Sequence, residues 1–183
     1  MDTINACLQN ILNDLRVEYL EEFDRNFQRG SFFGTQKWPK SSRPGAKTPL
    51  IDSGNLRRSI RGTVRGNTVA FSSSLPYASI HNTGGTLIVT TKMKRYFWAK
   101  YIAATGKKTT TKSGKPSNSK KNRTLSAAAQ FYKAMALKKV GSKIKIPQRQ
   151  FLGHHASLEA PGKAIIKRNI DELMQKTLPG NKH

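Results

Sequence analysis

Acidic residues are scarce in this sequence, and the shortage limits what the protein can do. The 183 residues include 10 Asp and Glu against 33 Lys and Arg, which gives a formal net charge of +23. A surface this basic repels itself and is usually met by a polyanion or an acidic partner. Asp52 is the only acid between residues 25 and 158, so that region cannot supply the paired carboxylates of acid–base catalysis.

Cysteine and long apolar runs are also scarce. Cys7 is the single cysteine, which excludes an internal disulfide and a multi-cysteine zinc site, and we expect it to be a small core residue. No apolar run approaches the roughly 18 residues of a membrane span. The N-terminus lacks the basic-then-apolar order of a signal peptide, so we expect a protein with no membrane segment that is used without export.

The histidines and glycines do not form the patterns of known catalytic or metal sites. His154 and His155 are adjacent and so do not share a face of a helix or strand, which argues against a metal site. We expect His81 to make a structural hydrogen bond. Ser53 is not in a G-x-S-x-G elbow, and Gly84-Gly85 lacks the surroundings of a phosphate loop. The sequence therefore predicts a non-enzymatic protein with no cofactor.

The charge is distributed unevenly along the chain. Residues 1–24 carry a net charge of −5, residues 25–158 carry +26, and residues 159–183 carry +2. An acidic first helix and a basic body could attract each other within one molecule, or head to tail between copies. A solvated acidic helix face is an equally good interpretation.

Apolar residues at three- and four-residue spacing predict helices over residues 3–28, 125–140 and 157–176, the last one capped by Ser157. Asp52 or Ser53 is expected to cap a short helix that ends near Ile60.

Alternating and β-branched residues predict a hairpin over residues 62–73, strands within 86–103 that include 96–98 and 101–102, and a last strand or extended arm over 144–151. Residues 30–50 are expected to be irregular, with Phe32, Phe33 and Trp38 anchored on the core. The predicted fold class is α+β: a single domain over 1–183, in which a small antiparallel β-sheet packs with an N-terminal helix (1–28) and a C-terminal helix.

Residues 105–124 contain no hydrophobic residue, so nothing offsets the entropy of ordering them, and we predict a long, mobile basic loop. Its cations could neutralise phosphates of DNA or meet an acidic partner, although a solvated loop without a ligand is an equal alternative. Tyr96, Trp98 and Tyr101 alternate with cations, a pattern that suits base stacking but more often marks an ordinary strand. The seven cations of the loop are Lys107, Lys108, Lys112, Lys115, Lys120, Lys121 and Arg123.

Three short motifs carry a resemblance to a known family. They are L-I-D-S-G-N-L-R-R-S-I at residues 50–60, P-Y-A-S-I-H-N-T-G-G at 76–85 and I-P-Q-R-Q-F-L-G at 146–153. In this order they resemble the virion morphogenesis or tail-completion proteins of Mu-like tailed phages, which are related to siphophage head–tail connector proteins. The motif residues with implied structural roles are Asp52, Ser53, Gly54, Leu56, Tyr77, His81, Gly84, Gly85, Pro147, Arg149 and Phe151.

The match covers roughly residues 20–175. Ser53 replaces the usual Thr, Asn82-Thr83 replaces a Gln–aromatic pair, and residues 105–124 look like an insertion on which the family is silent.

The resemblance implies a non-enzymatic structural protein of the phage neck or upper tail, with an α+β fold. Such proteins form rings of about six copies that complete the tail and join it to the head connector. The implied partners are further copies, the head–tail connector or adaptor, and tail terminator or tube proteins, with double-stranded phage DNA in the lumen as a further candidate. The expected location is the virion, and the host cytoplasm during assembly. Two alternatives remain open: a freestanding nucleic-acid-binding protein, suggested by charge alone, and the tail terminator ring itself.

Overall fold

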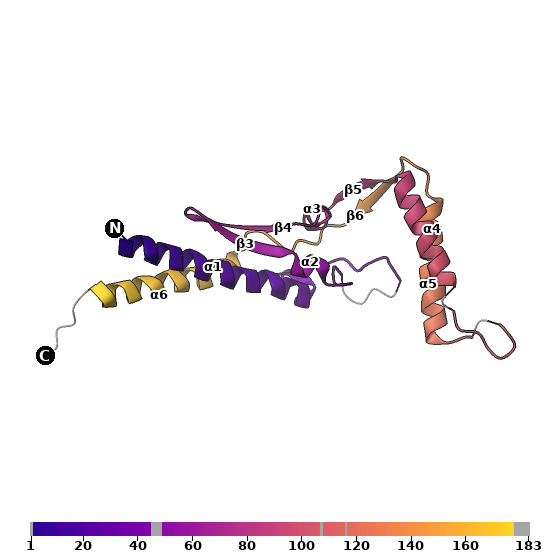
Figure 1. The fold of residues 1–183 in the computed structure, drawn as a ribbon, viewed down its shortest axis with the longest axis horizontal. Coiled ribbons are helices and arrows are strands. Elements are labelled where there is room, and N and C mark those ends of the chain that lie inside the picture. The colour runs from indigo at the N-terminus through magenta and orange to yellow at the C-terminus, as the bar shows by residue number, and fades with distance from the viewer. Residues whose placement is uncertain (1, 45–48, 107, 116, 178–183) are drawn as a thin grey trace.

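The computed structural model describes residues 2–44, 49–106, 108–115 and 117–177. The chain is elongated, with two long helices at one end, a pair of helices at the other, and short strands between them (Figure 1). The helices are α1 (Asp2–Arg29), α2 (Asn55–Arg58), α3 (Ala78–Thr83), α4 (Thr91–Thr105), α5 (Lys120–Leu137), a 3₁₀ turn η1 (Ala156–Leu158) and α6 (Glu159–Thr177). The strands are β1 (Ser31–Phe32), β2 (Gln36–Lys37), β3 (Ile60–Arg65), β4 (Thr68–Ser73), β5 (Gly85–Ile88) and β6 (Lys143–Ile146).

The predicted α+β class is confirmed, but the strands form three separate antiparallel pairs instead of one sheet. The pairs are β1–β2, β3–β4 and β5–β6. The β3–β4 hairpin corresponds to the one expected over residues 62–73 and lies against α1 in Figure 1. In the β5–β6 pair, Gly85 lies opposite Ile146 and Ile88 lies opposite Lys143. This narrow ribbon joins the body of the molecule to α4 and α5, and we call residues 85–146 the arm.

The helices α1 and α6 lie side by side (Figure 1). The Tyr19 hydroxyl donates a hydrogen bond of 3.1 Å to the carbonyl of Leu158. Arg168 and Asn169 of α6 donate bonds of 2.7 and 3.0 Å to the Asp14 carboxylate, so part of the acidic first helix is paired within the molecule. The start of the C-terminal helix differs from the prediction: η1 precedes α6, and the imidazole of His155, not Ser157, caps η1 by accepting the backbone N–H of Ser157.

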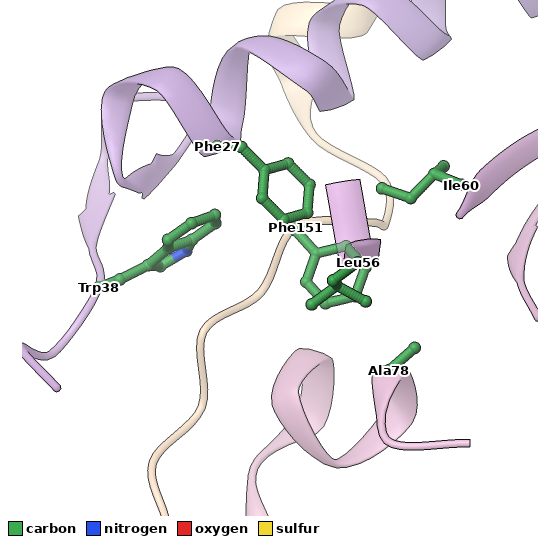
Figure 2. Close-up of a cluster of buried hydrophobic side chains, with 6 residues drawn as sticks. All are labelled: Phe27, Trp38, Leu56, Ile60, Ala78 and Phe151. Carbon is green, nitrogen blue, oxygen red and sulfur yellow. The ribbon is translucent and has the colours of Figure 1, made fainter. Parts of the chain in front are cut away.

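The hydrophobic core consists of aromatic side chains between α1 and the loops that follow it. Phe27, Trp38 and Phe151 meet at its centre, and Leu56, Ile60 and Ala78 complete this cluster (Figure 2). Phe32 and Phe33 belong to a second buried cluster with Phe23 and Leu158. The prediction that Phe32, Phe33 and Trp38 anchor residues 30–50 on the core is therefore confirmed.

An extended segment, residues 147–153, crosses the core without a neighbouring strand, and side chains satisfy its backbone. Asn26 is fully buried; its amide nitrogen donates to the Phe151 carbonyl (3.2 Å), and its oxygen accepts the Phe33 N–H (2.8 Å). The Asn82 oxygen accepts the N–H groups of Phe151 and Leu152 at 2.8 and 2.9 Å. Buried backbone groups need hydrogen-bond partners. The side-chain amides of Asn26 and Asn82 supply the hydrogen bonds that a neighbouring strand would otherwise make to this segment.

The strand prediction for residues 96–98 and 101–102 is wrong, because these residues belong to the helix α4. The Thr90 hydroxyl accepts the Met93 N–H at 3.2 Å and caps the helix. Met93, Phe97, Tyr101 and Ala104 recur at helical spacing and are the less exposed side of α4. Aromatic residues favour strands, which explains the wrong prediction. The three- and four-residue spacing of the less exposed residues, in contrast, agrees with a helix that packs against α5.

The loop predicted over residues 105–124 is shorter than expected, since α4 includes Thr105 and α5 begins at Lys120. A polar residue organises the connection. The amide nitrogen of buried Asn122 donates bonds of 2.7 Å to the carbonyls of Thr109 and Ser117, and its oxygen accepts the Thr109 N–H at 3.0 Å. The prediction of a long mobile loop considered only hydrophobic burial, and not the hydrogen bonds by which a buried polar side chain can order a loop. Lys107 lies outside the described residues.

Replacing Asn26 with alanine should destabilise the fold strongly. The variant leaves the Phe151 carbonyl and the Phe33 N–H buried without their partner, at a cost of about 1–3 kcal/mol for each group. Urea denaturation of Asn26→Ala measures the loss in the free energy of unfolding. The matched control is Asn13→Ala, because Asn13 is exposed and its amide bonds to the Gln9 carbonyl of the same helix, so its removal should change little. Equal stability of the two variants would contradict the role given to Asn26.

Replacing Gly84 with alanine should also destabilise the fold. Gly84 has φ +73°, and an added Cβ would lie 3.0 Å from the backbone nitrogen of Gln148 in the 147–153 segment. Strain of this kind costs on the order of 1–3 kcal/mol. Gly106 is the control because its φ is −72° and an added Cβ would meet nothing closer than 3.6 Å. Thermal unfolding of the two variants compares them, and a Gly84→Ala variant as stable as Gly106→Ala would refute the close approach.

Candidate functional site

Residues from all three motifs line one open cleft of about 490 Å³. The first motif contributes the run from Leu50 to Leu56, the second contributes Tyr77 and His81, and the third contributes Arg149. The lining residues outside the motifs are Ser41, Arg43, Pro49 and Tyr96. Motifs that are up to 100 residues apart in the sequence thus form one surface. We call it the motif cleft.

Asp52 is engaged in an ion pair at the cleft. The two terminal nitrogens of the Arg43 guanidinium, Nη1 and Nη2, each lie 2.8 Å from a different carboxylate oxygen, which is a bidentate arrangement. The hydrogen bond from Arg43 holds the pKa of Asp52 below its usual range. Asp52 does not cap α2 as predicted: the cap residue is Gly54 at φ +74°, and no side chain makes the cap bond. The Ser53 hydroxyl accepts the Asn55 N–H at 3.4 Å, a long bond at the start of the helix.

Arg149 is the buried cation of the cleft, with only 8% of its surface exposed. Its guanidinium donates to the carbonyls of Pro39 (2.8 Å) and Lys40 (3.1 Å). Burial lowers the pKa of Arg149. In the described part of the chain no carboxylate pairs with it, so its bonds are to neutral backbone oxygens. Arg149 therefore ties the loop after Trp38 to the 147–153 segment and forms part of the cleft wall.

His81 lies beside Arg149. The backbone N–H of Arg149 donates a hydrogen bond of 2.8 Å to the backbone carbonyl of His81, and this bond joins α3 to the 147–153 segment. The ring differs from the prediction, because its buried Nδ1 atom has no hydrogen-bond partner among the residues that the structure describes. Burial, and to a smaller extent the charge of Arg149, lowers the pKa of His81. The imidazole is therefore held in its neutral form over a wider pH range than an exposed histidine.

The other motif residues hold the fold around the cleft instead of lining it. Gly84 allows the close approach of Gln148, Gly85 begins β5 opposite Ile146, and Phe151 fills the core. Pro147 begins the extended segment. Leu56 belongs both to the core cluster and to the cleft wall.

The predicted basic site is separate from the motif cleft. Lys108, Lys112 and Lys115 lie in the connection at the tip of the arm, and Lys120, Lys121 and Arg123 lie in the first turn of α5. The motifs do not include four of the cleft residues: Ser41, Arg43, Pro49 and Tyr96. Arg43 stands in an irregular segment with no local pattern, and Tyr96 was assigned to a strand.

Comparisons with family models, curated proteins and solved structures found no match to this chain. None of the helices within residues 2–44, 49–106, 108–115 and 117–177 is long and apolar enough to cross a membrane. Over the same residues, no three or more of the side chains that commonly bind metals lie together.

His81 should make the protein less stable as the pH falls. Its folded-state pKa is lowered, so the unfolded chain binds a proton first, at an ordinary pKa of about 6.5. The contribution to stability is present above that value and is lost below it, so the free energy of unfolding should fall between about pH 7 and pH 5. Denaturation at several pH values should show a shallower fall for His81→Gln than for the native chain. The exposed His154 is the control, and a His81→Gln profile that matches His154→Gln would contradict this account.

Proposed function

We propose that this protein is a non-enzymatic structural subunit of the neck or upper tail of a tailed phage, where copies form a ring that completes the tail and joins it to the head connector. The observation that carries the proposal is the convergence of the three motifs. Asp52, Tyr77, His81 and Arg149 come from three separate motifs and line one cleft. The residues that carry the resemblance thus line one surface beside the 147–153 segment, and this supports the proposal.

Uncovered apolar side chains on α6 support an assembly of several copies. Ile166, Ile170 and Met174 are 40%, 43% and 51% exposed and recur every four residues on one face of the helix. Gly162 and Asn169 are buried residues of the same helix, and they face Leu15, Tyr19 and Asp14 of α1 instead. Contiguous apolar surface on a highly charged protein marks an interaction site. A neighbouring copy in a ring would cover this stripe.

The elongated shape also suits a ring subunit. The α1–α6 pair and the arm lie at opposite ends of the molecule (Figure 1). Contacts that join one end of a subunit to a different surface of the next copy are heterologous, and such contacts close into rings when the rotation allows it.

The proposal predicts a joining defect in a phage that carries this gene. Deleting the gene should leave DNA-filled heads and tails that lack the completing ring unjoined in electron micrographs of the lysate, and the native gene in trans should restore virions. Ile170→Lys places a charge on the apolar stripe, so it should weaken self-association at least about tenfold, or about 1.4 kcal/mol, and fail to complement.

Lys163→Gln is the matched control because Lys163 lies on the same helix and pairs only with exposed Glu159. Sedimentation of the purified variants checks self-association. Intact virions from the deletion would overturn the neck function, and full complementation by Ile170→Lys would overturn the role of the stripe.

A further inference from the structure

The arm carries positive charge without any compensating acid. Residues 85–146 contain 16 Lys and Arg and no Asp or Glu. Every ion pair found in the described part of the chain lies outside the arm, in the body formed by α1, α2, α6 and the loop around Asp52. Among the residues that the structure describes, the cations of the arm therefore have no ion-pair partner, and most of them are exposed. We propose that the arm binds double-stranded DNA through the phosphate backbone, without reading its sequence.

The structure combines cations that appeared separate in the sequence. Because residues 91–105 form a helix that packs along α5, Lys92, Arg95 and Lys100 belong to the same projecting helix pair as the basic residues of α5, instead of to a distant strand. Figure 1 shows the two helices running side by side away from the body. The projecting arm therefore carries the basic residues of β5–β6, of both helices and of the tip.

The spacing of the cations suits a linear polyanion. The 18 residues of α5 span about 27 Å, which approaches the 34 Å of one turn of B-form DNA. Lys120, Lys121 and Arg123 lie at the tip end of α5, Lys133 lies farther along it, and Lys138 and Lys139 follow its last turn. All six are exposed. A duplex presents phosphates along the whole of such a length, whereas an acidic protein patch would meet only one part of it.

The start of α5 supports an anionic partner. Its first turn holds Lys120, Lys121 and Arg123 and no acid, although the helix macrodipole favours negative charge at this end. The Ser119 hydroxyl caps the helix, and the bonds of Asn122 to Thr109 and Ser117 order the tip around it. The fold therefore holds three cations where they repel both one another and the helix dipole, an arrangement that phosphates would stabilise.

The aromatic residues of the arm favour a duplex over a single strand. Tyr96 and Trp98 are 55% and 37% exposed, but residues two apart on a helix point about 200° away from each other. The Lys100 ammonium lies 5.5 Å from the centre of the Tyr96 ring, and the Trp98 ring packs edge-on against Tyr101. These rings do not form one continuous platform on which successive bases could stack.

This proposal goes beyond the neck function and does not depend on it. Fluorescence anisotropy with a labelled 30-base-pair duplex of arbitrary sequence tests it, with the full chain at salt concentrations from 0.05 to 0.3 M. About six phosphate contacts would give a log–log slope of about −5. An arm variant in which Lys108, Lys112, Lys115, Lys120, Lys121 and Arg123 are changed to Gln should bind at least a hundredfold more weakly at 0.1 M salt, with a shallower slope.

The matched control removes the same charge from the body and keeps the arm intact. It changes Lys37, Lys40, Arg65, Lys163, Lys167 and Lys176 to Gln, all of which are exposed. Its affinity should stay within a few-fold of the native value, and circular dichroism should show both variants folded. Equal losses in the two variants would show that net charge alone attracts DNA and would overturn the proposal.

Three further outcomes would also overturn the proposal. The first is unchanged binding by the arm variant. The second is tighter binding of a 30-nucleotide poly-dT strand than of the duplex, which would favour base stacking. The third is displacement of the duplex by poly-glutamate at equal charge concentration, which would favour an acidic protein partner. None of these results would affect the joining experiment, which measures assembly.

Discussion

The fold depends on how the backbone of residues 147–153 is satisfied inside the core. Asn26 and Asn82 bond to it from two different helices, Trp38 donates its indole N–H to the Gln150 carbonyl at 2.7 Å, and Arg149 reaches out of it to Pro39 and Lys40. Through these bonds one extended stretch aligns α1, α3 and the loop after Trp38. The core cluster around Phe151 forms where they meet, and the motif cleft is the outer side of the same junction.

Several local elements of the body, among them α1 and the β3–β4 hairpin, could be predicted from the sequence, but the contacts between the elements could not. The apolar stripe of α1 and the Gly66-Asn67 hairpin have clear local patterns. The bonds of Asn26 have none, because a buried amide in a helix looks like any polar residue and its partner Phe151 is 125 residues away. The cleft could not be predicted for the same reason. Each motif can be recognised in the sequence, but the contact between the three motifs exists only in the folded chain.

The errors on the arm have a related cause. Residues 91–105 contain four aromatic residues, which favour strands, and their helical spacing was outweighed by that composition. Residues 105–124 lack apolar residues, so only a polar network could order them, and the single buried Asn122 supplies it. The excess of positive charge in this region could be predicted from the sequence. The arrangement of the cations in space could not, because it depends on the packing of α4 against α5.

The pairing of Gly85 with Ile146 gives the molecule a modular construction. The chain leaves the body at Gly85 and returns beside the same point 61 residues later, so the two ends of the arm are neighbours. Chain inserted between adjacent ends does not alter the path of the rest of the protein. The arm can therefore lengthen, shorten or change its charge during evolution while Asn82 and Phe151 on either side keep their contacts. The basic tip of the arm and the motif cleft are in this sense separate parts of one chain.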